Sequence, residues 1–261
     1  MSNLLEQVFK EKALIAYVTL GDPSVEATIT YCKALIDAGI SMIEIGLPFS
    51  DPIADGPIIQ ASHQQALATG EDVSVNRGFA LIKQLKEYAP NVPILIMAAT
   101  NIIMQYGYQS FFKQANDVNC DGLIMPDCSF EMVQAINQIQ QPPNVPLINL
   151  VSPVCDTERL KNIVTYSKGF IYLISSTGIT GERNEFSNKL KQLVMDIKNI
   201  KNIPVAIGFG ISQQDHCKRL SQFADGIIIG SHFVKLIQEK PSLKEGIDAV
   251  CNRVKQFKAV L

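Results

Sequence analysis

The chain has 261 residues, 47% of them hydrophobic, and its 23 basic and 25 acidic residues give a net charge of −2. This length suits one large domain or two small ones with a sizeable core. The basic residues are scattered, so neither nucleic acid nor an anionic membrane is an expected partner. The amino terminus lacks the apolar core of a signal peptide, and no apolar run approaches the roughly 20 residues of a membrane span.

The spacing of the cysteines and histidines indicates whether disulfides or a metal site are expected. The six cysteines are widely spaced without a CxxC pair, which is typical of reduced core thiols and indicates a cytoplasmic protein. No two histidines stand at ligand spacing on one element, so we expect packing or surface roles for them and no metal site. These residues are Cys32, Cys120, Cys128, Cys155, Cys217 and Cys251, with His63, His216 and His232.

Short apolar runs alternate along the chain with longer segments of helical period. Residues 24–39, for example, place apolar side chains near i, i+3, i+4 and i+7, which predicts a helix. The runs are continuous rather than alternating, which favours parallel strands covered on both faces. The eight predicted strands are 13–20, 41–47, 92–99, 121–126, 145–151, 169–175, 203–210 and 225–231.

Eight strand-then-helix units favour one fold class. A doubly wound sheet usually has fewer strands, and ~250 residues is typical of an eightfold barrel. No Ser/Gly/Pro-rich linker divides the chain. The sequence therefore predicts an α/β fold, a (β/α)8 TIM barrel with an extra N-terminal helix, as a single domain over residues 1–261.

A glutamate lies inside the second predicted strand. Glu44 stands between Ile43 and Ile45, and the loop "PFSDPIADG", residues 48–56, follows. In these barrels the loops after the strands build the active site. A buried carboxylate is costly unless it is paired or functional, so Glu44 is either an ion-paired stabilising residue or a catalytic one. Desolvation by its neighbours should raise its pKa.

Glycine-rich strand ends indicate a phosphate site. Gly208–Gly210 ends the seventh strand, and Gly230 and Ser231 end the eighth and open a helix. Barrels often hold phosphate between these two loops at a helix N-terminus. Gly181, in the loop after the sixth strand, offers another backbone donor. With no Walker lysine motif or dinucleotide fingerprint, a small phosphate ester is the expected substrate.

Five motifs in order carry a family resemblance: "YVTLGDP", "EIGLPFSDPIADGPIIQ", "STGITG", "GFGIS" and "GS". From near the amino terminus to the last helix, the chain resembles the tryptophan synthase alpha subunits. The resemblance implies a lyase of tryptophan biosynthesis that cleaves indole-3-glycerol phosphate into indole and glyceraldehyde 3-phosphate. It implies no cofactor or metal in this chain. It also implies a pyridoxal-phosphate beta subunit as partner, in an α2β2 heterotetramer to which indole is passed.

The resemblance also assigns residues. It makes Glu44 the general acid/base and Asp55 the acceptor of the indole N–H. Asp51 and Pro48 match loop positions that take part in closure and face the partner. The expected substrate-binding residues are Tyr17, Ile59, Ile124, Tyr172, Thr180 and Phe209, and the expected phosphate-binding residues are Gly181, Gly210, Gly230 and Ser231. For Ile59 and Ile124, core packing is as good an explanation.

Two segments depart from the family pattern and keep alternatives open. Ala98, Ala99 and Thr100 stand where tyrosines are usual, which could loosen the indole pocket. Ser129 replaces a usual proline and could change partner contact. One alternative is a barrel retained mainly as an allosteric binding subunit. The other is a different phosphate-binding barrel, such as a sugar-phosphate isomerase or epimerase, which would not need the residue 48–56 loop.

Overall fold

The computed structural model describes residues 4–139, 145–175, 183–208, 210–211 and 213–261. Eight parallel strands form a closed barrel in chain order, with β8 paired to β1 through Ala13 and Gly226. The eight-stranded barrel predicted from the sequence is thus confirmed. The strands are β1 (Ala13–Thr19), β2 (Met42–Gly46), β3 (Ile94–Met97), β4 (Gly122–Ile124), β5 (Leu147–Val151), β6 (Ile171–Ile174), β7 (Val205–Gly208) and β8 (Gly226–Ile229).

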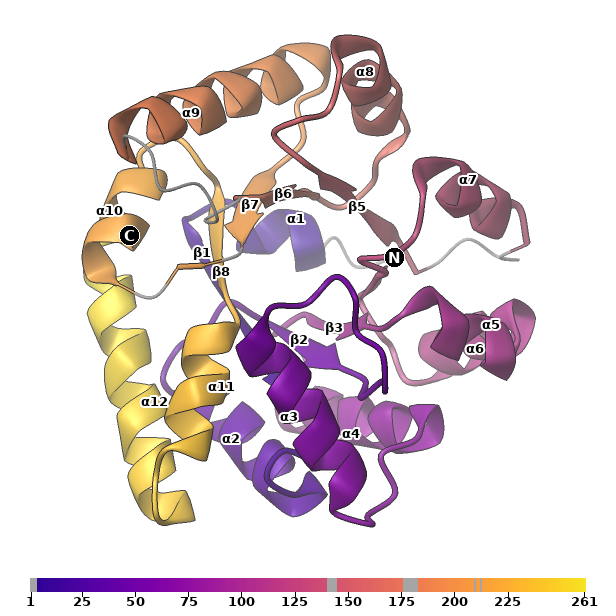
Figure 1. Ribbon diagram of the computed structural model, residues 1–261, viewed down its shortest axis with the longest axis vertical. Coiled ribbons are helices and arrows are strands. Elements are labelled where there is room, and N and C mark those ends of the chain that lie inside the picture. Colours follow the sequence, from indigo (N-terminus) through magenta and orange to yellow (C-terminus); the bar gives the residue numbers. More distant parts are fainter. Residues whose placement is uncertain (1–3, 140–144, 176–182, 209, 212) are drawn as a thin grey trace.

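Helices surround the barrel and cover the outer face of its strands (Figure 1). Several begin at a side-chain cap: Ser24, for example, accepts a hydrogen bond from the Ala27 N–H, which satisfies a free donor of the first turn. The helices are α1 (Leu4–Val8), α2 (Val25–Asp37), α3 (Pro57–Ala68), α4 (Val75–Tyr88), α5 (Thr100–Tyr106), α6 (Tyr108–Asp117), α7 (Phe130–Ile139), α8 (Thr157–Tyr166), α9 (Arg183–Ile200), α10 (Gln214–Leu220), α11 (Ser231–Gln238) and α12 (Leu243–Lys258).

Two apolar layers result from the alternation of side chains along each strand. One lies between strands and helices and includes Ile43 and Ile45 together with residues of α2, α4 and α12. The other fills the barrel and includes Met42 and Ile124. The continuous apolar runs are therefore explained by burial on both faces.

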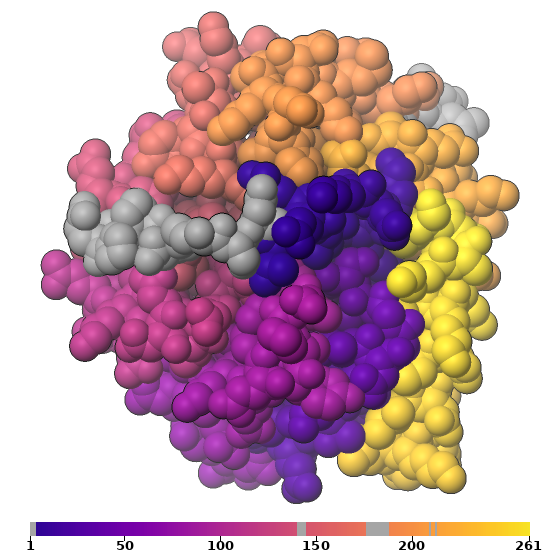
Figure 2. All heavy atoms as spheres, turned by 180° about the vertical axis from the view of Figure 1, so that it is seen from behind, coloured from indigo at the N-terminus to yellow at the C-terminus, as the bar shows by residue number. Residues whose placement is uncertain are grey.

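The predicted extra N-terminal helix is present as α1 and closes the amino end of the barrel. Leu5 is buried with the interior layer, and the Phe9 ring lies 5.3 Å from that of Phe170. Figure 2 shows this first segment over the centre of the face seen from behind. The opposite, carboxyl end of the barrel is where the loops after the strands meet. Within the described residues, no helix combines the length and hydropathy that a bilayer span requires.

Candidate active site

A cavity of about 230 Å³ opens at the carboxyl end of the barrel. It lies between the loop after β2, the interior strand residues and the amino end of α11. Most of the predicted site residues that the structure describes line it together. The lining residues are Tyr17, Glu44, Asp55, Gly56, Pro57, Ile58, Ile59, Met97, Tyr172, Gly210, Gly230 and Ser231.

Glu44 points into the barrel. Its Cα is paired with that of Tyr17 on β1, and its side chain is fully buried. Neither carboxylate oxygen has a hydrogen-bond partner among the described residues. Burial raises the pKa of Glu44 from 4.5 to about 8, so the group is mostly protonated at neutral pH. Ile43 and Ile45 point to the outer layer, so the desolvation comes from the barrel interior and not from these sequence neighbours.

Two tyrosines flank Glu44, each lying over a glycine of the next strand. A Cβ on Gly46 would collide with the Tyr17 hydroxyl, and one on Gly208 would collide with that of Tyr172. Each ring therefore occupies space that is free only because the neighbouring strand has a glycine there. The pKa of Tyr172 is raised well above its ordinary value, by burial first and then by Glu44 and Asp55. Burial likewise raises the pKa of Tyr17, so both hydroxyls keep their protons at neutral pH.

Asp55 is held at the end of the β2 loop. Its backbone N–H donates to Pro52 O at 3.1 Å, and the Gln60 side-chain amide donates to Asp55 O at 2.8 Å. Its side chain is only 9% exposed, and Oδ1 has no partner among the described residues. Burial, followed by the charge of Asp127, raises the pKa of Asp55 to about 6. At neutral pH Asp55 is an ionised acceptor beside a protonated Glu44, so the two carboxyl groups differ in their tasks.

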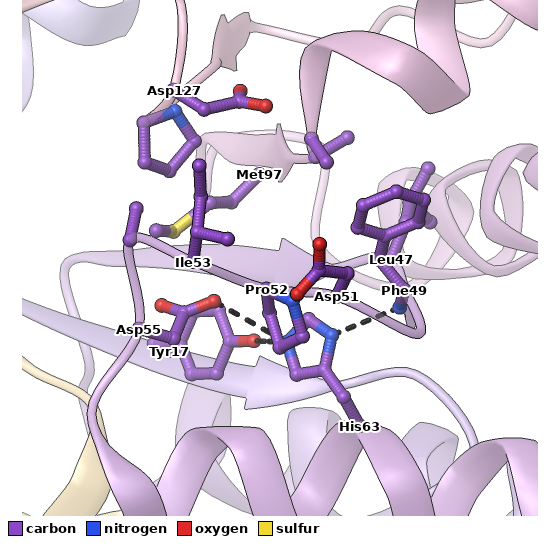
Figure 3. A pocket seen from close by; sticks show the side chains of 14 residues that line it. Tyr17, Leu47, Phe49, Asp51, Pro52, Ile53, Asp55, His63, Met97 and Asp127 are labelled. Atoms are coloured by element: carbon purple, nitrogen blue, oxygen red, sulfur yellow. Dashed lines mark hydrogen bonds and ion pairs between the residues drawn. The ribbon is translucent and has the colours of Figure 1, made fainter.

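His63 belongs to the site, although the sequence suggested only a packing or surface role. It lies on α3, one helical turn beyond Ile59, and is buried. Its Nε2 lies 3.0 Å from the Tyr17 hydroxyl and 3.7 Å from Asp55 Oδ2, and its Nδ1 accepts from Phe49 N–H at 3.0 Å (Figure 3). The i, i+4 spacing from Ile59 was the signal that could have identified it.

Both segments that depart from the expected family pattern make local contacts in the fold. Thr100 opens α5, and both its backbone N–H and its hydroxyl donate to Asp127 Oδ1, at 2.9 and 2.8 Å. Ala98 and Ala99 line a smaller cavity beside Asp127 and the β2 loop (Figure 3). Ser129 accepts from the Met132 N–H at 3.2 Å and so caps the first turn of α7.

The opposite end of the cavity is suited to an anion. Gly210 has φ +74°, a left-handed conformation that glycine adopts without strain. Gly230 immediately precedes α11, whose first residue is Ser231, and both residues line the cavity. A helix N-terminus favours negative charge through its free N–H groups and the helix dipole.

Four predicted site residues are not among those that line this cavity, and the structure describes only one of them. Ile124 is fully buried in the interior layer and is not among the residues that line the cavity. Thr180, Gly181 and Phe209 lie outside the described residues. Within the described residues, no group of three or more His, Cys, Asp or Glu side chains could hold a metal ion.

Comparisons with known proteins identify the family of the chain. The family model "Tryptophan synthase alpha chain" matches residues 3–261. A tryptophan synthase alpha chain from Thermoanaerobacter sp. is 39% identical over 250 residues, covering 96% of this chain and 94% of the relative. The solved alpha subunit from Legionella pneumophila has a TM-score of 0.89 at 27% identity, covering 100% and 98% of the two chains. That from Campylobacter jejuni has a TM-score of 0.85 at 33% identity, covering 94% and 97%. This chain belongs to the tryptophan synthase alpha chain family.

Proposed function

We propose that the cavity cleaves indole-3-glycerol phosphate into indole and glyceraldehyde 3-phosphate, the lyase half-reaction of tryptophan synthesis. The observation that carries this proposal is Glu44, a fully buried carboxyl with both oxygens free of described partners, opening on the same cavity as Asp55. An ion-paired stabilising role does not fit, because no described cation reaches Glu44. The reaction needs such a group, since a proton must be both delivered and removed.

The reaction assigns a different role to each carboxyl group. Protonated Glu44 gives its proton to indole C3, and the resulting carboxylate takes the proton of the adjacent glycerol hydroxyl as the aldehyde forms. The C3–glycerol bond breaks, and its electron pair returns to the indole ring. Asp55, ionised at neutral pH, accepts the indole N–H and stabilises the positive charge that develops there. Tyr17, Ile59 and Tyr172 form the walls of the site.

The direct test is indole release by the purified chain. Indole and glyceraldehyde 3-phosphate should form in equal amounts from indole-3-glycerol phosphate without any added cofactor. The assay should be repeated with a cognate beta subunit. No indole in either assay would refute the proposed function.

The phosphate group of the substrate should lie between Gly210 and the start of α11. A ligand that binds only the folded state raises thermal stability by mass action, so glycerol 3-phosphate should raise the Tm. Gly210→Val should abolish this shift, because a side chain and a strained φ would displace the loop.

Gly70→Val is the matched control for Gly210→Val. Gly70 has the same φ of +74°, and a Cβ there would meet nothing within 4 Å. Its replacement should strain the backbone equally yet leave the ligand-induced shift intact. If Gly210→Val kept the shift as well, the phosphate would bind elsewhere.

Part of the same proposal is an α2β2 assembly with the beta subunit that carries pyridoxal phosphate in this family. Large apolar side chains are exposed along neighbouring loops and helices at the carboxyl end: Ile53 at 74%, Met104 at 50%, Met132 at 41% and Val154 at 91%. These four residues, here called the apolar rim, follow β2, β3, β4 and β5 in turn. Such exposed apolar side chains are what a protein–protein interface would cover. A partner docked there would contact the β2 loop that holds Asp55.

Docking should therefore raise turnover, because it would hold the β2 loop in its productive position. We expect faster indole formation with a cognate beta subunit and co-sedimentation of the two chains. Replacing Ile53 and Val154 together by Asp should weaken both effects. Met195→Asp, on an exposed position of α9, should not. No association at micromolar concentrations, with turnover unaffected by the partner, would indicate a free-standing lyase.

Two further statements belong to the proposal. We place the protein in the cytoplasm, supported by the six cysteines, which are all free. We also regard residues 1–261 as one domain, supported by the pairing of the last strand with the first.

A further inference from the structure

A directed chain of hydrogen bonds runs through His63. The Phe49 backbone N–H donates to Nδ1 at 3.0 Å, so this nitrogen carries no proton of its own. Burial lowers the pKa of His63 to about 4, so the ring is neutral near pH 7. A neutral imidazole with a free Nδ1 holds its proton on Nε2. Nε2–H is therefore the donor in the 3.0 Å bond to the Tyr17 hydroxyl.

That bond determines whether the Tyr17 hydroxyl can donate or accept a further hydrogen bond. A hydroxyl has two acceptor positions and one proton to donate. Nε2–H of His63 fills one acceptor position, and the Thr19 hydroxyl, donating at 3.4 Å, fills the other. The pKa of Tyr17 is far above its usual range, through burial and then the nearby Asp55, so the phenol keeps its proton. Tyr17 and Glu44 line the same cavity.

We propose that His63 is a positioning residue for this reaction: as the Nε2–H tautomer it fixes the Tyr17 hydroxyl as a hydrogen-bond donor to the bound substrate. This inference rests on the proposed function for the identity of the substrate. The arrangement of His63 and Tyr17 is independent of it and can be measured separately.

His63 also joins the two ends of the β2 loop. Phe49 stands near the start of the loop, and Asp55 near its end, with Oδ2 3.7 Å from Nε2 (Figure 3). Both contacts converge on one imidazole ring, on the helix that follows the loop. If Phe49 moved away, Nδ1 would lose its hydrogen-bond donor, and either ring nitrogen could then carry the proton. The donor state of Tyr17 is therefore tied to the conformation of the loop.

The tautomer can be observed directly. The chain has only three histidines, so a protein labelled with 15N in the imidazole ring gives few signals, and His63→Gln assigns those of His63. We expect His63 to show a protonated Nε2 and an unprotonated Nδ1, unchanged between pH 6 and pH 8. A protonated Nδ1, or a ring that titrates in this range, would overturn the proposal whether or not the chain releases indole.

Kinetics then test the action through Tyr17. His63→Asn keeps an acceptor for Phe49 N–H but cannot reach Tyr17, whereas His63→Gln can reach Tyr17 with its amide N–H. Tyr17→Phe and His63→Asn should each lower kcat/KM about 3- to 10-fold, the size of one neutral hydrogen bond. His63→Gln should recover part of this loss, and His216→Gln serves as the control with unchanged kcat/KM.

The double variant decides between positioning and mere stabilisation. If His63 acts through the hydroxyl, His63→Asn should have no further effect in the Tyr17→Phe background. An equal loss of kcat/KM in both backgrounds would mean that His63 only supports the fold. A wild type without indole release would refute the proposed function instead, while the 15N spectrum would still report on the tautomer.

Discussion

Glu44→Gln should lower indole formation about 10²- to 10⁴-fold, the usual loss when a positioned general acid/base is removed. The amide has nearly the volume of the carboxyl and fits the same interior position on β2. It cannot deliver a proton to C3, nor take one from the glycerol hydroxyl. Steady-state release of indole from indole-3-glycerol phosphate measures the effect. Glu158→Gln, an exposed residue of α8, is the matched control and should retain full activity.

The same substitution should not weaken the fold, which separates loss of chemistry from loss of structure. Between pH of about 4.5 and about 8, folded Glu44 holds a proton that the unfolded chain has lost. The free energy of unfolding contributed by this group therefore falls as pH rises through that window. Glutamine does not titrate, so the variant should gain stability relative to the wild type as pH rises toward 8. Denaturant unfolding at pH 5 and pH 8 measures the difference.

Near-normal indole formation by Glu44→Gln would refute the mechanism proposed here. A variant that lost activity and also unfolded at every pH would point to a structural role for Glu44. The two measurements together therefore distinguish an ion-paired stabilising residue from a proton shuttle, the alternatives that the sequence left open.

The barrel was predictable because each strand carries a continuous apolar run and each is followed by a helical period. These local signals can be read from a single sequence. The predicted strands at 13–20 and 41–47 correspond to β1 and β2 and are only slightly longer than the observed ones. The place of Glu44 followed from the same pattern. Its pKa is raised by burial, as expected. Closure of the barrel also brings Glu44 close enough to Tyr172 on β6 to add to the rise that burial causes in the pKa of that tyrosine.

The rest of the site depends on contacts that no spacing in the chain encodes. Thr100 is joined to Asp127, 27 residues away, and this carboxylate adds to the rise that burial causes in the pKa of Asp55. His63 could have been placed on the site face of α3 by its distance from Ile59. Its tautomer could not, because that depends on the Phe49 N–H at the other end of the loop. Hydrogen-bond direction is a property of the folded loop and not of the residue types.

Asp55→Asn should lower indole formation about 10²- to 10³-fold, the loss seen when one group that stabilises transition-state charge is removed. Asparagine keeps an oxygen that can accept the indole N–H, but it has no negative charge to offset the charge that develops on the ring. Burial keeps water from screening the missing charge, which makes the loss large. Asp72→Asn, an exposed residue beyond α3, is the matched control and should be fully active.

The pH profile of kcat/KM tests whether Asp55 must be ionised for activity. Below about pH 6 Asp55 gains a proton, and above about pH 8 Glu44 loses one, so the wild type should be most active between these limits. Asp55→Asn should abolish the acid limb and keep the alkaline one, because only the first depends on Asp55. His63→Gln should keep both limbs, which shows that the acid limb is not a histidine titration. If Asp55→Asn retained the acid limb while His63→Gln lost it, the titrating group would be His63, and Asp55 would no longer be the acceptor that must be ionised.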